Sequence, residues 1–205
     1  KPCVSRHIWA IIQMQLLTGS RPTEMLMIRP CDIDQSGKIW IYRCGEHKTA
    51  HHGFERTIYI GPKAQEVLRP FLTRPAESYC FSPAEAEAER RQARHLNRKT
   101  PLKYGNLPGT NCTIAPCRPA RDHYDVHSYR RAIERACNLA FVPPVHLRKH
   151  EGESNKQWQK RLGKKEKAEL KAWYKQYSWH PHQLRHNAAT SIRKEFGLDT
   201  ARVIL

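Results

Sequence analysis

Hydrophobic side chains recur with helical spacing in several separate stretches of this chain. Residues 4–17 and 124–140 each place apolar side chains every three or four positions, which predicts two helices that bury one face. A third helix is predicted to begin at Pro181 and to stop at Gly197. Its apolar positions follow a four-residue step, namely Leu184, Ala188, Ile192 and Phe196.

Two shorter stretches, 38–43 and 55–60, are rich in β-branched and aromatic residues and are joined by a polar segment. This pattern predicts a β-hairpin. Before the hairpin, Gly19 can turn the chain and Ser20 can cap a new helix, whose first turn suits Pro22. The expected fold is therefore mainly α with a small antiparallel β-hairpin or sheet, of the α+β class.

Two segments depart from this scaffold in composition. Residues 84–122 start as an acidic, alanine-rich helix and become strongly basic and rich in proline, whereas residues 146–178 predict one basic helix from about Asn155 to Tyr177. We interpret both as insertions into a single domain that spans residues 1–205.

The net charge points to a polyanionic partner. The chain holds 36 Lys and Arg against 19 Asp and Glu, a formal charge of +17, which makes nucleic acid the first candidate. No apolar run approaches the roughly 20 residues of a spanning helix, and the first residues do not resemble a signal peptide. Seven scattered cysteines suit a reducing cytoplasm, so we expect a cytoplasmic protein without a membrane partner.

One group of possible metal ligands lies in the first insertion: Cys112, Cys117, His123 and His127. The gap between its cysteines and histidines is far shorter than in the familiar zinc finger, and prolines interrupt it. The pattern weighs against zinc, and the prediction is no metal and no cofactor.

The strongest chemical signal is the start of the helix at Pro181. His182 and Arg185 are three residues apart and leave the helix on one face, near the end where free N–H groups attract an anion. A guanidinium fork beside an imidazole suits a phosphate. Taken alone, this helix start and Lys48 in the hairpin loop are more typical of a solvated basic surface than of a site, and Arg21 at its helix start is equally typical of either.

Together these pieces resemble the tyrosine recombinase (phage integrase) family, the relatives of type IB topoisomerases. The matching motifs occur in family order: Thr-Gly-Ser-Arg-Pro-Thr-Glu at 18–24, the lysine of His47-Lys48-Thr49 between two strands, and His-Gln-Leu-Arg-His at 182–186. The resemblance covers the scaffold, about 4–82, 124–142 and 179–205. It implies the DNA breaking-rejoining fold of the family's catalytic domain.

The resemblance also implies a role for each matching residue. Arg21 and Arg185 would clamp the phosphate oxygens of double-stranded DNA, and Lys48 would bind that phosphate and protonate the leaving 5′ oxygen. His182 would act as an acid–base or orienting group, with Glu24 and His186 in support. The implied activity is site-specific DNA recombination or integration through a 3′-phosphotyrosyl link, as in mobile elements, by a nucleoid-associated enzyme that associates with itself on DNA when full-length.

The chain departs from the family pattern at the nucleophile. Its eight tyrosines all precede His182, whereas the family places a Gly-His element and then the tyrosine after the last helix seen here. We expect a fragment without the C-terminal tyrosine segment and without the N-terminal DNA-clamping domain, inactive in cleavage by itself. The alternatives are a catalytically inactive DNA-binding protein on the same scaffold, and a basic RNA- or nucleoprotein-associated module whose binding depends on the two insertions.

Overall fold

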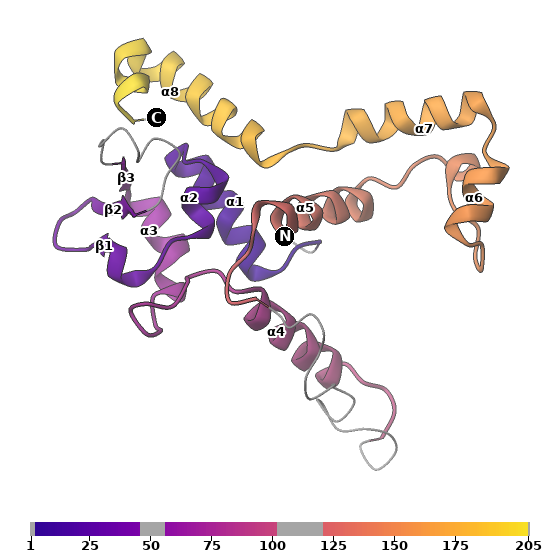
Figure 1. The fold of residues 1–205 in the computed structure, drawn as a ribbon, viewed down its shortest axis with the longest axis horizontal. Coiled ribbons are helices and arrows are strands. Elements are labelled where there is room, and N and C mark those ends of the chain that lie inside the picture. The colour runs from indigo at the N-terminus through magenta and orange to yellow at the C-terminus, as the bar shows by residue number, and fades with distance from the viewer. Residues whose placement is uncertain (1–2, 46–55, 102–120, 205) are drawn as a thin grey trace.

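The computed structural model describes residues 3–45, 56–101 and 121–204, and within them the chain is mainly helical with one small antiparallel sheet (Figure 1). The α+β prediction is confirmed. The helices are α1 (Arg6–Thr18), α2 (Pro22–Leu26), α3 (Pro62–Leu68), α4 (Pro83–Leu96), α5 (Val126–Ala140), α6 (Asn155–Arg161), α7 (Lys164–Tyr177) and α8 (Pro181–Ile204). Short 3-10 turns occupy η1 (Pro30–Asp32), η3 (Arg69–Phe71) and η4 (Val145–Leu147).

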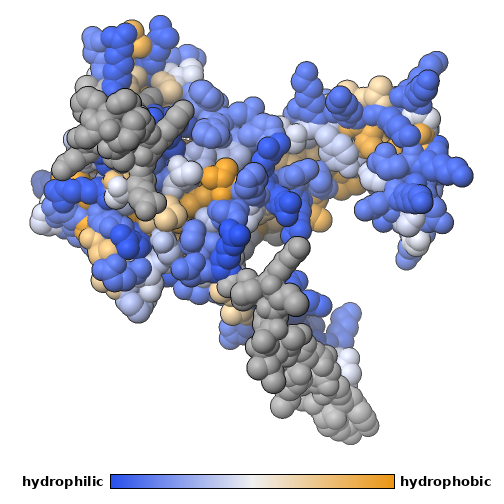
Figure 2. All heavy atoms as spheres, in the orientation of Figure 1, coloured by the Kyte–Doolittle hydropathy of each residue, from blue (hydrophilic) through white to orange (hydrophobic). Residues whose placement is uncertain are grey.

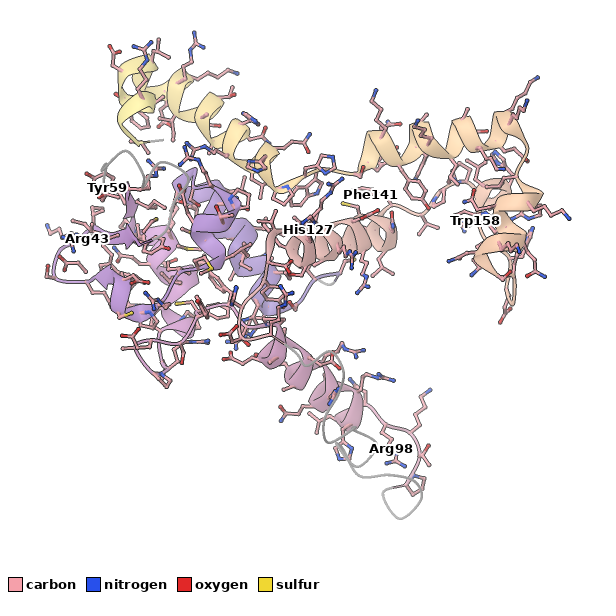
Figure 3. All side chains as sticks on the ribbon, viewed as in Figure 1. Arg43, Tyr59, Arg98, His127, Phe141 and Trp158 are labelled. Atoms are coloured by element: carbon pink, nitrogen blue, oxygen red, sulfur yellow. The ribbon has the colours of Figure 1, made fainter. Side chains whose placement is uncertain are left out.

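The sheet consists of β1 (Ile33–Asp34), β2 (Trp40–Cys44) and β3 (Arg56–Ile60), with β2 in the middle. The two predicted strands are present and pair antiparallel, with their starts displaced by one or two residues, while the two-residue β1 was not predicted. Alternate residues face the core, so Ile58 and Ile60 are buried, whereas Arg43 and Tyr59 lie on the outer surface (Figure 3).

The predicted helix over 4–17 is α1, which is the centre of the main core. Its side chains Ile11 and Met14 are fully buried, and α3, α5 and α8 all pack against it. Gly19 ends α1 with φ 65°, a left-handed conformation that glycine adopts without strain. Polar contacts also link α1 to α5, since the Tyr129 hydroxyl donates to Gln15 Oε1 at 2.8 Å.

The third predicted helix is α8, and Gly197 (φ 85°) interrupts it as expected. Its apolar stripe is buried only at the start, at Leu184 and Ala188, and α8 packs mainly against α1. The expectation that Phe196 also faces the core was wrong, because its side chain is 58% exposed. The first turns of α8 are therefore the part that the core positions.

The segment interpreted as the first insertion begins with the predicted helix, α4, which projects from the body (Figure 1). Its root is attached by ion pairs from Arg74 to Glu85 at 3.0 Å and from Arg6 to Glu89 at 2.6 Å. The side chains of the rest of α4 are largely exposed.

In the second such segment, the single helix predicted over 155–177 was wrong. The helix breaks between α6 and α7, where Leu162 turns into a small separate core with Leu147 and Leu170. Gly163 then starts α7, and its N–H donates to the Glu166 carboxylate at 2.7 Å. This pair of helices, with η4, extends away from the main core (Figure 1).

Candidate phosphate-binding site

Arg21 occupies the short connection between α1 and α2. Its own backbone caps α2, so the prediction that Ser20 would cap this helix was wrong. The Ser20 side chain is instead fully buried, 3.0 Å from the Thr18 hydroxyl. Because Gly19 ends one helix and Pro22 begins the next, the backbone of Arg21 is held from both sides.

Glu24 fixes the guanidinium of Arg21. The Glu24 carboxylate accepts the Arg21 backbone N–H at 2.7 Å and Nη1 of the Arg21 side chain at 2.8 Å. Glu24 is only 1% exposed, and the Tyr42 hydroxyl donates to its backbone carbonyl at 2.9 Å. The carboxylate therefore lies where its predicted bracing role requires, in contact with Arg21.

A third cation, Arg56, joins this pair and was not predicted. Its Nε lies 3.4 Å from Glu24 Oε1, and the side chain is 14% exposed. Nε and Nη2 of Arg56 are buried and make no hydrogen bond with any described residue. The signal was present in the strand pattern, because period-two alternation places Arg56 on the same inward face as Ile58 and Ile60, and a charge on that face needs an anion.

Arg185 reaches the same place from α8. Its Nη1 donates to the Gly19 carbonyl oxygen at 2.7 Å, two residues before Arg21. Burial lowers the pKa of Arg185 from its usual value, and the positive charges of Arg21 and Arg56 lower it further, while Glu24 opposes them. The structure thus brings together Arg21 and Arg185, two guanidinium groups that are far apart in the sequence.

The two histidines of the α8 motif lie at the solvent-facing start of this helix. His182 and His186 are both exposed, and neither side chain hydrogen-bonds to another residue of the described ranges. The His180 N–H donates to Gln183 Oε1 at 2.6 Å, which caps the helix. His182 therefore stands one turn before Arg185, able to contact a ligand from solvent.

Lys48 lies outside the described residues. On either side of residues 46–55, Cys44 and Arg56 pair in the β2–β3 register, and Arg56 contacts the Glu24 carboxylate.

The described residues do not bring the four possible zinc ligands of the first insertion together. Cys112 and Cys117 lie outside the described residues, and the His123 ring contacts Asp122 at 2.7 Å and Tyr79 at a centroid distance of 4.5 Å. His127 is exposed on α5 (Figure 3). Within the described ranges, no three side chains of His, Cys, Asp or Glu are placed to hold a metal ion.

Arg21 and Arg56 contact the buried Glu24 carboxylate, and Arg185 lies close enough to feel the charges of all three. These three guanidinium groups exceed the single carboxylate in charge, and we call Arg21, Glu24, Arg56 and Arg185 the arginine cluster. Such a cluster attracts a phosphate and can hold it through paired N–H donors. Since Glu24 and the Gly19 carbonyl already orient Arg21 and Arg185, little reorganisation accompanies binding. Hydrophilic residues predominate on the face of the molecule seen in Figure 2, in keeping with the net charge of +17.

Comparisons with known proteins name no relative: no family model matches the chain, and no curated protein or solved structure is significantly similar to it. In the described ranges no helix has both the length and the apolar character to cross a membrane.

Proposed function

We propose that this chain binds double-stranded DNA and that the arginine cluster promotes phosphodiester transfer, in the manner of a tyrosine recombinase. The observation that supports this most directly is the contact of Arg185 with the Gly19 carbonyl, which sets its guanidinium beside Arg21. A charge of +17 adds the long-range attraction that a polyanion requires.

The chemistry that such a cluster would favour is transfer through a pentacoordinate phosphorane. This state carries more negative charge on the non-bridging oxygens than the ground state, so oriented guanidinium groups stabilise it selectively. Glu24 keeps Arg21 in place, and His182 or Lys48 would move the proton to or from the 5′ oxygen.

The tyrosine nucleophile is not expected to be Tyr42, the tyrosine that packs against the arginine cluster. Tyr42 is the tyrosine that contacts Glu24, but its side chain is 2% exposed and its hydroxyl is donated to a backbone carbonyl. Burial raises the pKa of Tyr42 well above its usual value, which disfavours the phenolate. Its role is structural support of the Glu24 backbone.

The rejoining half of the reaction can be tested without a tyrosine nucleophile, because the substrate already carries the aryl ester. A DNA strand that ends in a 3′-(4-nitrophenyl) phosphate resembles a phosphotyrosyl link, and a second strand with a 5′-hydroxyl is annealed beside it on a complementary strand. Attack of the 5′ oxygen on phosphorus forms the phosphodiester, breaks the bond to the aryl oxygen and releases 4-nitrophenolate, while the hydroxyl proton passes to a base. Colour and strand length report the two products independently.

Arg185→Ala is expected to slow this joining by about 10²–10³-fold, the usual effect of removing one oriented donor to a transition-state oxyanion. Arg185→Lys keeps the charge but loses the fork, so it should recover binding more than rate. Arg193→Ala, an exposed arginine on the same helix, is the matched control and should join normally. If the unaltered chain binds duplex DNA but joins no faster than buffer, the transfer chemistry is wrong and a non-catalytic DNA-binding protein remains.

A further inference from the structure

An open cleft of about 770 Å³ lies between α5 and the α6–α7 pair, away from the arginine cluster. Its walls combine aromatic rings with basic side chains, and Glu134 is the acidic residue among them. The members that matter here are Trp158, Tyr174 and Trp179 among the aromatic residues, and Arg130, Lys167 and Lys171 among the basic ones.

The aromatic wall is held in place by its own contacts. The Trp158 indole N–H donates to the Leu147 carbonyl at 3.0 Å, and both Trp158 and Tyr174 pack against the small core of this helix pair. Outside the lining of the cleft, Phe141 at the end of α5 (Figure 3) stacks on Tyr177 with ring centroids 5.1 Å apart, which links α5 to α7. The rings are therefore oriented before any ligand arrives.

The lining matches the chemistry of an unpaired nucleotide. Aromatic faces accept bases by stacking, and adjacent lysines or arginines accept the phosphates, with little dependence on sequence. A cavity of this size holds one small ligand, so a duplex cannot enter it, whereas one or two nucleotides of a single strand can.

The start of α8 connects the cleft to the arginine cluster. His180 lines the cleft and its N–H caps α8 by donating to Gln183, and Arg185 is five residues further along the chain. Five residues of α-helix rise about 7.5 Å, a separation that one or two nucleotides of a strand can span. We propose that this cleft binds unpaired nucleotides of a DNA strand whose neighbouring phosphate lies on the arginine cluster, a proposal that rests on the DNA-binding function above.

The experiment compares the affinity of the 205-residue chain for two fluorescent DNAs, a fully paired duplex and the same duplex with a three-nucleotide gap. The gapped DNA should bind roughly tenfold more tightly, the effect of about one stacked base. Equal affinity for the two DNAs would overturn the proposal and leave an acidic protein segment as the better candidate for the cleft.

Two pairs of variants locate the effect. The double variant Lys167→Gln with Lys171→Gln removes two charges from the cleft and should abolish the preference for gapped DNA. The control, Lys165→Gln with Lys175→Gln, removes the same charge from exposed positions of α7 outside the cleft and should keep that preference. A preference that survives the cleft variant contradicts the assignment.

A second comparison keeps the small core filled. Tyr174→Phe retains an aromatic face and should keep the preference, while Tyr174→Leu fills similar space without one and should lose it. Arg185→Ala should weaken binding to both DNAs equally and leave their ratio unchanged. Failure of the arginine cluster to join DNA is thereby distinguished from failure of the cleft to select unpaired DNA.

Discussion

Replacing Glu24 by glutamine isolates the charge that organises the arginine cluster. The substitution preserves shape, and the amide oxygen can still accept the Arg21 backbone N–H that now lies 2.7 Å from the carboxylate. What it removes is the one negative charge between Arg21 at 2.8 Å and Arg56 at 3.4 Å. The amide group that replaces the second oxygen cannot accept a hydrogen bond through its nitrogen.

The expected cost follows from burial. Removing one partner of a buried ion pair destabilises a protein by about 3–5 kcal/mol, because the remaining charge stays buried without compensation. Glu24 is 1% exposed, but Arg21 is 29% exposed and partly screened by water, which favours the lower end, about 3 kcal/mol. For a chain of this length, that loss lowers Tm by about 6–12 °C.

Urea unfolding followed by circular dichroism measures this free energy directly. Glu77→Gln is the matched control, since Glu77 pairs with Arg29 at 3.1 Å but is 78% exposed, and its loss should cost less than about 1 kcal/mol. In the double variant Glu24→Gln with Arg56→Met, the effects should fall short of additivity by about 1–3 kcal/mol. Two results would refute the idea that this carboxylate holds the cluster together. One is a loss of unfolding free energy in Glu24→Gln no larger than in Glu77→Gln, and the other is full additivity of the Glu24→Gln and Arg56→Met effects.

Three further outcomes follow from the structure. Burial lowers the pKa of His7, so below pH 6.5 the unfolded chain takes up a proton before the folded chain does. The free energy of unfolding should therefore fall as the pH drops from 6.5 through the folded pKa. Thermal melts of His7→Phe should not show this pH dependence. Burial raises the pKa of Cys80 to about 12, so iodoacetamide mapped by mass spectrometry should modify exposed Cys31 in the native chain and Cys80 only after unfolding. Hydrogen bonds from Arg161 lower the pKa of Glu153 to about 2. The stability that this pair contributes should persist above pH 4.5 and be lost as the pH falls through 2, with faster amide hydrogen exchange in α6. Unchanged exchange in Glu153→Gln at neutral pH would contradict this.

Local pattern alone was sufficient for most of the scaffold. Helical spacing predicted α1, α5 and the start of α8, and alternation with β-branched residues predicted β2 and β3. These patterns involve only residues a few positions apart, so they can be recognised in the sequence without knowledge of tertiary contacts. The two guanidinium groups could be named in advance for the same reason, since Arg21 and Arg185 each lie at a recognisable helix start.

Tertiary packing decided what those local signals could not. The break before α7 depends on the packing of Leu162 against Leu147 and Leu170, a contact that the spacing of apolar residues along the chain does not predict. Arg56 belongs to the arginine cluster only because β3 brings it against Glu24. Likewise, Arg185 reaches Arg21 because α8 crosses α1 and places the guanidinium on the Gly19 carbonyl. The sequence by itself determined which cations were available, and long-range burial determined which of them gather near the buried carboxylate of Glu24.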